Sequence, residues 1–102
     1  MNRIKTYAQF QSISLNKSAV VIAKTQGCSV CMPVTLRLSE LMENYPTLPL
    51  YELYIEDIPE FRGQHLVFTV PTIIILKNQS ELHRESRFID WDRLTLAIES
   101  IL

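Results

Sequence analysis

The chain lacks both an excess of charge and a long apolar run. Its 10 Lys and Arg residues nearly balance its 11 Asp and Glu residues, for a net charge of −1, so there is no basic field to recruit nucleic acid or an anionic membrane. No apolar stretch approaches the roughly 20 residues that span a bilayer. No apolar segment of a secretory signal follows the charged residues near the start. We therefore expect a cytoplasmic protein that binds neither nucleic acid nor membrane.

Repeats, low-complexity stretches and linkers are absent as well. The length of 102 residues is that of one domain with a core of its own. Hydrophobic residues make up 47% and charged residues 21% of the chain, which is typical of ordinary globular proteins. We expect a single domain over residues 1–102 and a monomer.

Residues that bind metals are scarce. The chain has two cysteines, Cys28 and Cys31, and two histidines, His65 and His83. Structural zinc takes four such ligands, and the two histidines fall on different predicted elements. We expect no metal and no bound cofactor.

Apolar patterning divides the chain into alternating strands and helices. Short β-branched or alternating segments predict four strands, over residues 19–23, 50–55, 72–76 and 81–87, the last with the charges of a sheet edge. Apolar residues at helical spacing predict four helices, over residues 7–15, 29–45, 59–65 and 91–102. Asp57 and Asp90 are placed as N-caps of the last two helices, and residues 16–18 and 77–80 turn the chain. This order predicts an α/β fold with a mixed sheet between helices.

The two cysteines lie between a predicted buried strand and a predicted helix, in the run TQGCSVC over residues 25–31. Disulfide exchange needs a thiolate as nucleophile. The unpaired N–H groups and positive dipole end at the start of a helix favour a negative sulfur. We expect Cys28 at or just before the first helical residue and assign it as the attacking thiol. Cys31, one turn further and more buried, is then the resolving thiol.

Lys24 ends the strand that precedes the cysteines, with the same alternate-residue parity as Val20 and Ile22. If its ammonium reaches Cys28, the positive charge would stabilise the thiolate, so Lys24 is a candidate for tuning the acidity of that cysteine. The alternative is a lysine whose ammonium extends to solvent at the strand end. The sequence leaves both interpretations open.

With the segment Val70-Pro71-Thr72 before a buried strand, the cysteine motif makes the chain resemble the thioredoxin family over almost its whole length. The resemblance implies a thioredoxin-like fold with a central mixed sheet of four or five strands. It implies a thiol–disulfide oxidoreductase that acts on protein disulfides. An enzyme of the thioredoxin-reductase type is a candidate recycling partner, although the departures described below mean that reductase coupling does not follow from the resemblance. It also implies that Pro71 is cis and lies against the disulfide. Val70, Pro71 and Gly27 would then form the substrate-binding set, with an extended substrate pairing at Val70.

The chain also departs from the thioredoxin pattern. Ile22 stands where thioredoxins carry a buried aspartate, and Lys24 and Gly27 stand where they carry tryptophans. Two alternative functions therefore stay open. One is a thioredoxin-fold adaptor without catalytic turnover. The other is a glutathione-linked protein, because residues 69–71 and Lys24 also resemble glutaredoxins, although the glycine pair and aspartate of that family are missing from residues 82–90.

Overall fold

The structure, a computed structural model, describes residues 1–14, 17–78 and 80–102. Its five strands are β1 (Asn2–Ile4), β2 (Ala19–Lys24), β3 (Leu50–Tyr54), β4 (Thr72–Lys77) and β5 (Ser80–Ser86). Its helices are α1 (Tyr7–Ser14), α2 (Cys31–Met42), α3 (Pro59–Gln64) and α4 (Trp91–Glu99), with a single 3₁₀ turn, η1 (Ile55–Asp57). The predicted helix end at residue 15 and parts of both predicted turns, residues 16 and 79, lie outside the described residues.

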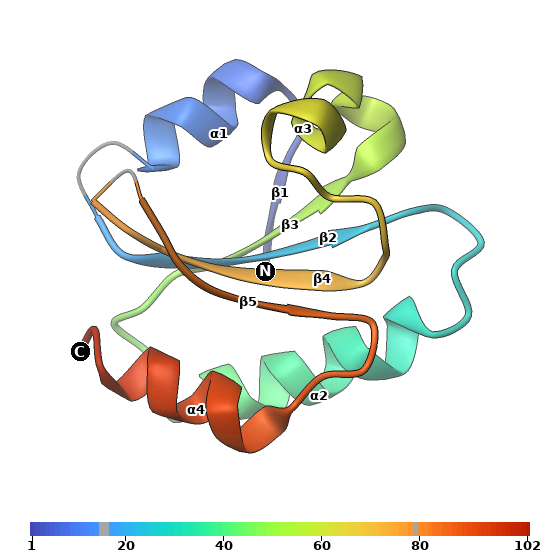
Figure 1. Cartoon of the computed structure of the whole chain (residues 1–102). Coiled ribbons are helices and arrows are strands. Elements are labelled where there is room, and N and C mark those ends of the chain that lie inside the picture. The colour runs from blue at the N-terminus through green and yellow to red at the C-terminus, as the bar shows by residue number, and fades with distance from the viewer. Residues whose placement is uncertain (15–16, 79) are drawn as a thin grey trace.

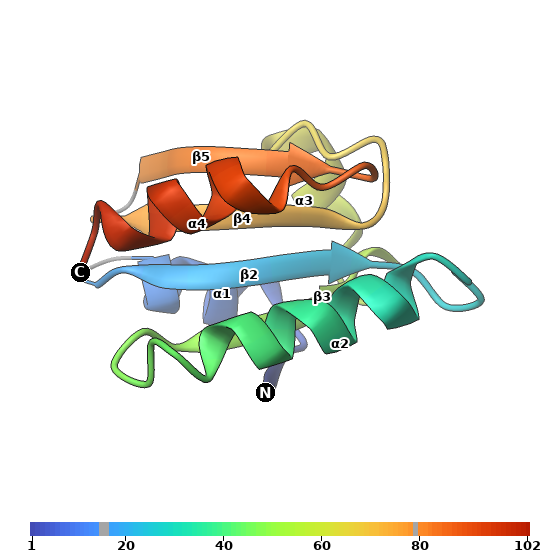
Figure 2. The same ribbon diagram turned by 90° about the horizontal axis from the view of Figure 1, so that it is seen from below.

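The five strands form one mixed sheet in the order β1-β3-β2-β4-β5. β1 and β2 run parallel to β3, whereas β4 is antiparallel to both β2 and β5. Helices α1 and α3 cover one face of the sheet, and α2 and α4 cover the other (Figures 1 and 2). The predicted mixed sheet between helices is confirmed. Strand β1 was not predicted, because three residues at a sheet edge are too few to show an alternating pattern.

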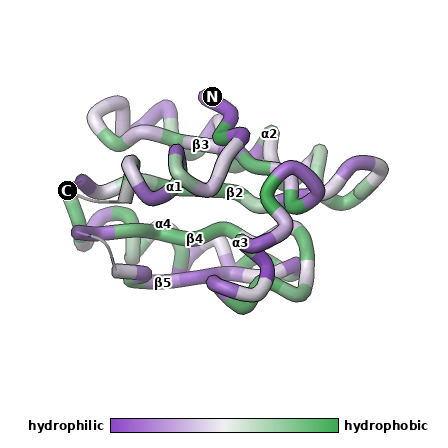
Figure 3. The backbone as a smooth tube through the Cα atoms, turned by 90° about the horizontal axis from the view of Figure 1, so that it is seen from above, coloured by the Kyte–Doolittle hydropathy of each residue, from purple (hydrophilic) through white to green (hydrophobic). Residues whose placement is uncertain are grey.

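Two hydrophobic clusters fill the space between the sheet and its helices. On one face, Val21 and Ile74 pack with residues of α1 and α3, and on the other, Ile22 and Ile73 pack with residues of α2 and α4. Strands β2 and β4 are therefore apolar on both sides, as buried central strands require. Along the sheet edge, β5 is hydrophilic where its neighbour β4 is hydrophobic (Figure 3), which agrees with the predicted edge strand.

Two details at the starts of the helices differ from the sequence-based expectation, and α2 and α4 each end three residues earlier than predicted, at Met42 and Glu99. Helix α2 begins at Cys31 and not at residue 29, because residues 28–31 form a turn in which the Cys31 N–H donates to the Cys28 carbonyl at 3.2 Å. Asp57 does not cap α3, since its carboxylate instead accepts a hydrogen bond from Arg3 at 2.6 Å and the N-cap position is taken by Ile58. The predicted cap of α4 is confirmed, with Asp90 accepting from the Arg93 N–H at 3.1 Å.

The strand directions bring three connecting segments to one end of the sheet. The carboxyl ends of β2, β3 and β5 and the beginning of β4 all meet there. The loop with the cysteines, the segment before β4 and the loop after β5 therefore lie at the same end, on the right in Figure 1. The Arg87 N–H donates to the Pro71 carbonyl at 2.7 Å and ties two of these segments together. None of the described helices is long and apolar enough to cross a membrane.

Candidate active site

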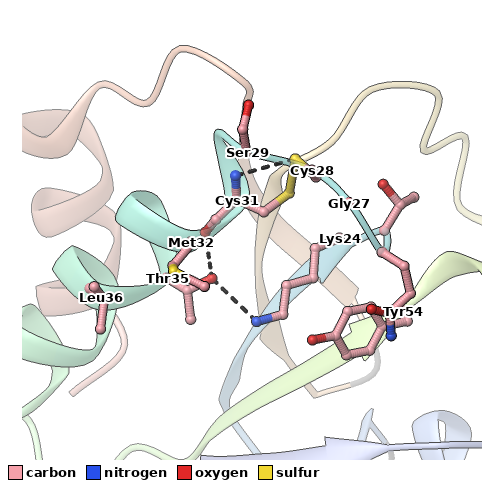
Figure 4. Close-up of a pocket in the computed structure, with 11 residues that line it drawn as sticks. Lys24, Gly27, Cys28, Ser29, Cys31, Met32, Thr35, Leu36 and Tyr54 are labelled. Carbon is pink, nitrogen blue, oxygen red and sulfur yellow. Dashed lines mark hydrogen bonds between the residues drawn. A yellow bond between two sulfur atoms is a disulfide. The ribbon is translucent and has the colours of Figure 1, made fainter.

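Cys28 and Cys31 are joined by a disulfide at the start of α2 (Figure 4). Their Cα atoms lie 5.3 Å apart. Cys31 is 3% exposed, whereas Cys28 is half-buried. The two sulfurs therefore differ in access to solvent, and Cys28 is the one that an incoming thiol or disulfide reaches more easily.

The backbone around Cys28 presents an N–H group to its sulfur. The turn before the motif passes through Gly27 with φ +73°, a left-handed conformation that glycine adopts without steric cost. At the first residue of α2, the Cys31 N–H lies 3.2 Å from Cys28 Sγ as well as from the Cys28 carbonyl. In the reduced protein this donor, together with the positive end of the helix dipole, favours a negatively charged Cys28 sulfur.

A surface pocket of about 560 Å³ adjoins the disulfide. It lies between the end of β2, the first turns of α2 and the end of β3, and Figure 4 shows its lining side chains. Both cysteines line it, together with Lys24, Met32, Thr35 and Tyr54. Since Met32 is strongly exposed, the pocket opens to the surface and gives the disulfide a path to solvent.

Lys24 forms one wall of this pocket, but its ammonium does not extend to solvent. The side chain is 10% exposed, and Nζ forms an ion pair with Glu52 Oε1 at 3.0 Å. Nζ also donates to Thr35 Oγ1 at 3.3 Å and lies 5.4 Å from the centre of the Tyr54 ring. The interpretation of Lys24 as a solvent-exposed lysine is therefore wrong. In the part of the chain that the structure describes, no contact joins Nζ to Cys28 Sγ.

Glu52 and Thr35 were not singled out from the sequence. Thr35 lies one helical turn after Cys31 and donates to the Cys31 carbonyl at 2.7 Å. Glu52 faces α2 because β3 pairs with β2 in a register that sets Ile22 opposite Glu52. A charged residue in the middle of a short strand was a signal for Glu52, but its partner depends on that register.

The segment before β4 is held in a defined conformation at the same end of the sheet. The Val70–Pro71 peptide bond is cis, as the family resemblance implied. Thr72 Oγ1 donates to the Thr69 carbonyl at 2.6 Å and contacts Ser86 Oγ at 3.0 Å. Across the described residues, no hydrogen bond engages the backbone of Val70. Its edge is therefore free for another extended chain.

Of the other predicted binding residues, Gly27 lies exposed in the turn before Cys28. Val70 lines a small pocket of about 60 Å³ together with Thr25, three residues before that cysteine. The structure thus brings Val70 close to the chain that leads into the motif. Large exposed hydrophobic side chains occur in the first turn of α2 and on the connecting segments at this end, with Met32 70%, Phe68 65% and Phe88 87% exposed. Exposed apolar side chains that gather at one end of a molecule favour an interaction surface there.

Comparison with known proteins places this site in context. No family model matches the chain. A thioredoxin-like protein of Bacillus subtilis, YdfQ, is 27% identical over 89 residues, which cover 87% of this chain and 80% of that protein. Thioredoxin-1 of Saccharomyces cerevisiae is 25% identical over 83 residues, or 80% of this chain and 81% of the yeast protein. The crystal structure of Fasciola hepatica thioredoxin superimposes with a TM-score of 0.85 over the whole of both chains, at 19% identity.

The chain is thioredoxin-like in sequence and in fold. The cysteine pair of this thioredoxin-like protein has the spacing and the place, after β2 and before α2, that the resemblance implied. Among the residues that the structure describes, no group of three His, Cys, Asp or Glu side chains could hold a metal ion.

Proposed function

We propose that this protein is a thiol–disulfide oxidoreductase that exchanges its Cys28–Cys31 pair with the disulfides of protein substrates. The observation that carries the proposal is the asymmetry of the pair. Cys28 is accessible and accepts an N–H at a helix start, whereas Cys31 is buried beside it within bonding distance. An attacking thiol needs access and a stabilised negative charge, and a resolving thiol needs proximity.

In the reduced protein, the Cys28 thiolate attacks one sulfur of a substrate disulfide. The S–S bond of the substrate breaks, its second sulfur leaves as a thiolate, and a mixed disulfide joins Cys28 to the substrate. Cys31 then loses its proton and attacks Cys28 Sγ, which releases the substrate as a dithiol and forms the Cys28–Cys31 disulfide. Two electrons pass from the protein to the substrate, so no cofactor is needed.

The substrate chain is proposed to lie along Val70. Its backbone edge is unpaired at the end of the sheet, and an extended segment that pairs there would carry its disulfide towards Cys28. Pro71 fixes the direction of this edge and Gly27 leaves room above the motif. The exposed side chains of Met32, Phe68 and Phe88 lie at the start of α2, before β4 and after β5, and they favour a protein substrate over a small solute.

Insulin reduction by wild type and by two matched serine variants tests the proposal. We expect Cys28→Ser to abolish reduction, because the attacking sulfur is lost. Cys31→Ser should still attack once and then accumulate a stable mixed disulfide, visible by mass spectrometry. Reduction that survives in Cys28→Ser would contradict the assigned roles. Wild-type protein that binds partners but reduces nothing would favour the adaptor, and activity strictly dependent on glutathione would favour the glutaredoxin-like alternative.

We propose that residues 1–102 act as a single domain and a monomer in the cytoplasm, where reduced thiols make a catalytic cysteine pair more plausible than a structural disulfide. A recycling enzyme of the thioredoxin-reductase type would return the disulfide to the dithiol. Light scattering of the purified protein tests the monomer, and coupling to purified thioredoxin reductase and NADPH tests the recycling partner.

A further inference from the structure

Among the residues that the structure describes, Lys24 is the charged residue that is buried, with 8% of its surface exposed. It lies on the face of the sheet that α2 covers, at the strand end nearest the disulfide. A buried ammonium loses its hydration and is kept only when partners compensate. Glu52 and Thr35 are the partners that compensate this ammonium.

The contacts around Lys24 run in a fixed order. Thr35 Oγ1 donates to the Cys31 carbonyl at 2.7 Å, Lys24 Nζ donates to Thr35 Oγ1 at 3.3 Å, and Glu52 Oε1 pairs with Nζ at 3.0 Å. The ammonium therefore lies between the carboxylate and the first turn of α2. Its positive charge, and not the negative charge of Glu52, is the one that Thr35 links to the Cys31 carbonyl.

We propose that Lys24, held in place by Glu52 and Thr35, stabilises the thiolate of Cys31. This inference rests on the proposed dithiol exchange, in which Cys31 is ionised twice. Cys31 must lose its proton to attack Cys28 Sγ, and it leaves as a thiolate when a reducing thiolate attacks Cys28 Sγ and breaks the disulfide. At 3% exposure, Cys31 has little water to solvate that charge, and burial alone would oppose it.

The target of Lys24 is thus the buried cysteine and not the accessible one. Cys28 already receives the Cys31 N–H at 3.2 Å, whereas no donor to the Cys31 sulfur is found among the described residues. The titratable groups that line the pocket with Cys31 are Lys24 on β2, Tyr54 on β3 and Cys28 in the loop before α2, and Glu52 on β3 pairs with Lys24. Because Lys24 acts across space and through Thr35, it is a positioning and electrostatic residue.

The experiment measures the ionisation of each cysteine alone. In a Cys28→Ser background, where Cys31 is the remaining thiol, thiolate ultraviolet absorbance is followed against pH. We expect Lys24→Met to raise the midpoint of Cys31 ionisation by about one pH unit, a tenfold loss of thiolate below the midpoint. Lys24→Arg keeps the charge and should restore most of the shift. Glu52→Gln removes the opposing carboxylate and should lower the midpoint, a change of sign that a merely structural role would not produce.

The matched control repeats Lys24→Met in a Cys31→Ser background, where the midpoint of Cys28 should move less. An unmoved Cys31 midpoint, or an equal or larger shift at Cys28, would overturn the inference. Insulin reduction by the wild type is read separately. If the wild type reduces insulin while the Cys31 midpoint stays unmoved, this inference fails and the proposed function stands. If the midpoint moves but insulin is not reduced, the electrostatic assignment stands and the proposed function fails.

Discussion

Reduction of the Cys28–Cys31 disulfide is expected to lower the stability of this protein, by an amount that depends on the length of the loop that the disulfide closes. The two cysteines are separated by 3 positions, so the disulfide closes a very short loop in the unfolded chain. The chain-entropy relation for such a loop gives about 1.5–2 kcal/mol of stabilisation of the oxidised form. A longer loop would give more, because the entropy grows with the logarithm of its length.

The reduced form gains a smaller opposing term. A Cys28 thiolate would accept the Cys31 N–H at the start of α2, and a charge at a helix terminus contributes about 0.3–1 kcal/mol. Since this favours the folded reduced protein, it is subtracted from the loop-closure term. We therefore expect the oxidised protein to be the more stable form by about 1 kcal/mol.

Urea unfolding with and without dithiothreitol measures this difference, followed by circular dichroism and by the fluorescence of Trp91. For a chain of this size, about 1 kcal/mol corresponds to a midpoint lower by roughly 0.3–1 M urea in the reduced protein. A variant with serine at both cysteine positions cannot form the bond, and its midpoint should not respond to dithiothreitol.

A reduced form that is more stable than the oxidised form would refute this reasoning. Thiolate stabilisation would then exceed loop closure, and the disulfide would be an oxidant of other proteins, since stabilising the reduced state raises the reduction potential. The same measurement therefore indicates the direction in which electrons flow under the proposed function.

Two further predictions concern groups outside the cysteine motif. Burial lowers the pKa of His65, whose ring contacts Tyr7 Oη at 2.9 Å. The unfolded chain therefore binds the proton more readily, so this contribution to stability is complete above the ordinary value near 6.5 and is lost as pH falls through the lowered value. Urea midpoints against pH should lose this dependence in His65→Gln, and an unchanged profile would contradict it. Phe88→Ala should raise KM for insulin several-fold without changing kcat or the urea midpoint, because Phe88 is 87% exposed. Leu96→Ala, an exposed site on α4, is the matched control, and equal KM values in the two variants would argue against a contact with substrate.

The sequence by itself determined the features that depend on neighbouring residues. The apolar β-branched runs over residues 19–23 and 72–76 can be buried on both sides only as central strands. They form β2 and β4, respectively. The spacing of Cys28 and Cys31 allows a disulfide within one turn. Asp90 caps α4 by accepting a hydrogen bond from the N–H of Arg93, three positions later. Local chemistry suffices for these, because each partner is close along the chain.

The tertiary structure decided the features whose partners are distant along the chain. Strand β1 forms because it pairs with the edge of β3. Asp57 does not cap α3 as predicted, because its carboxylate accepts a hydrogen bond from Arg3 on β1. The sequence pattern around Lys24 is equally that of a solvent-exposed lysine at a strand end. In the fold, the pairing of β2 with β3 and the packing of α2 enclose Lys24 between Glu52 and Thr35. A periodic pattern reports which face of an element is buried. The partner of a charge on that face is set by strand register and helix packing, which residues far apart in sequence fix together.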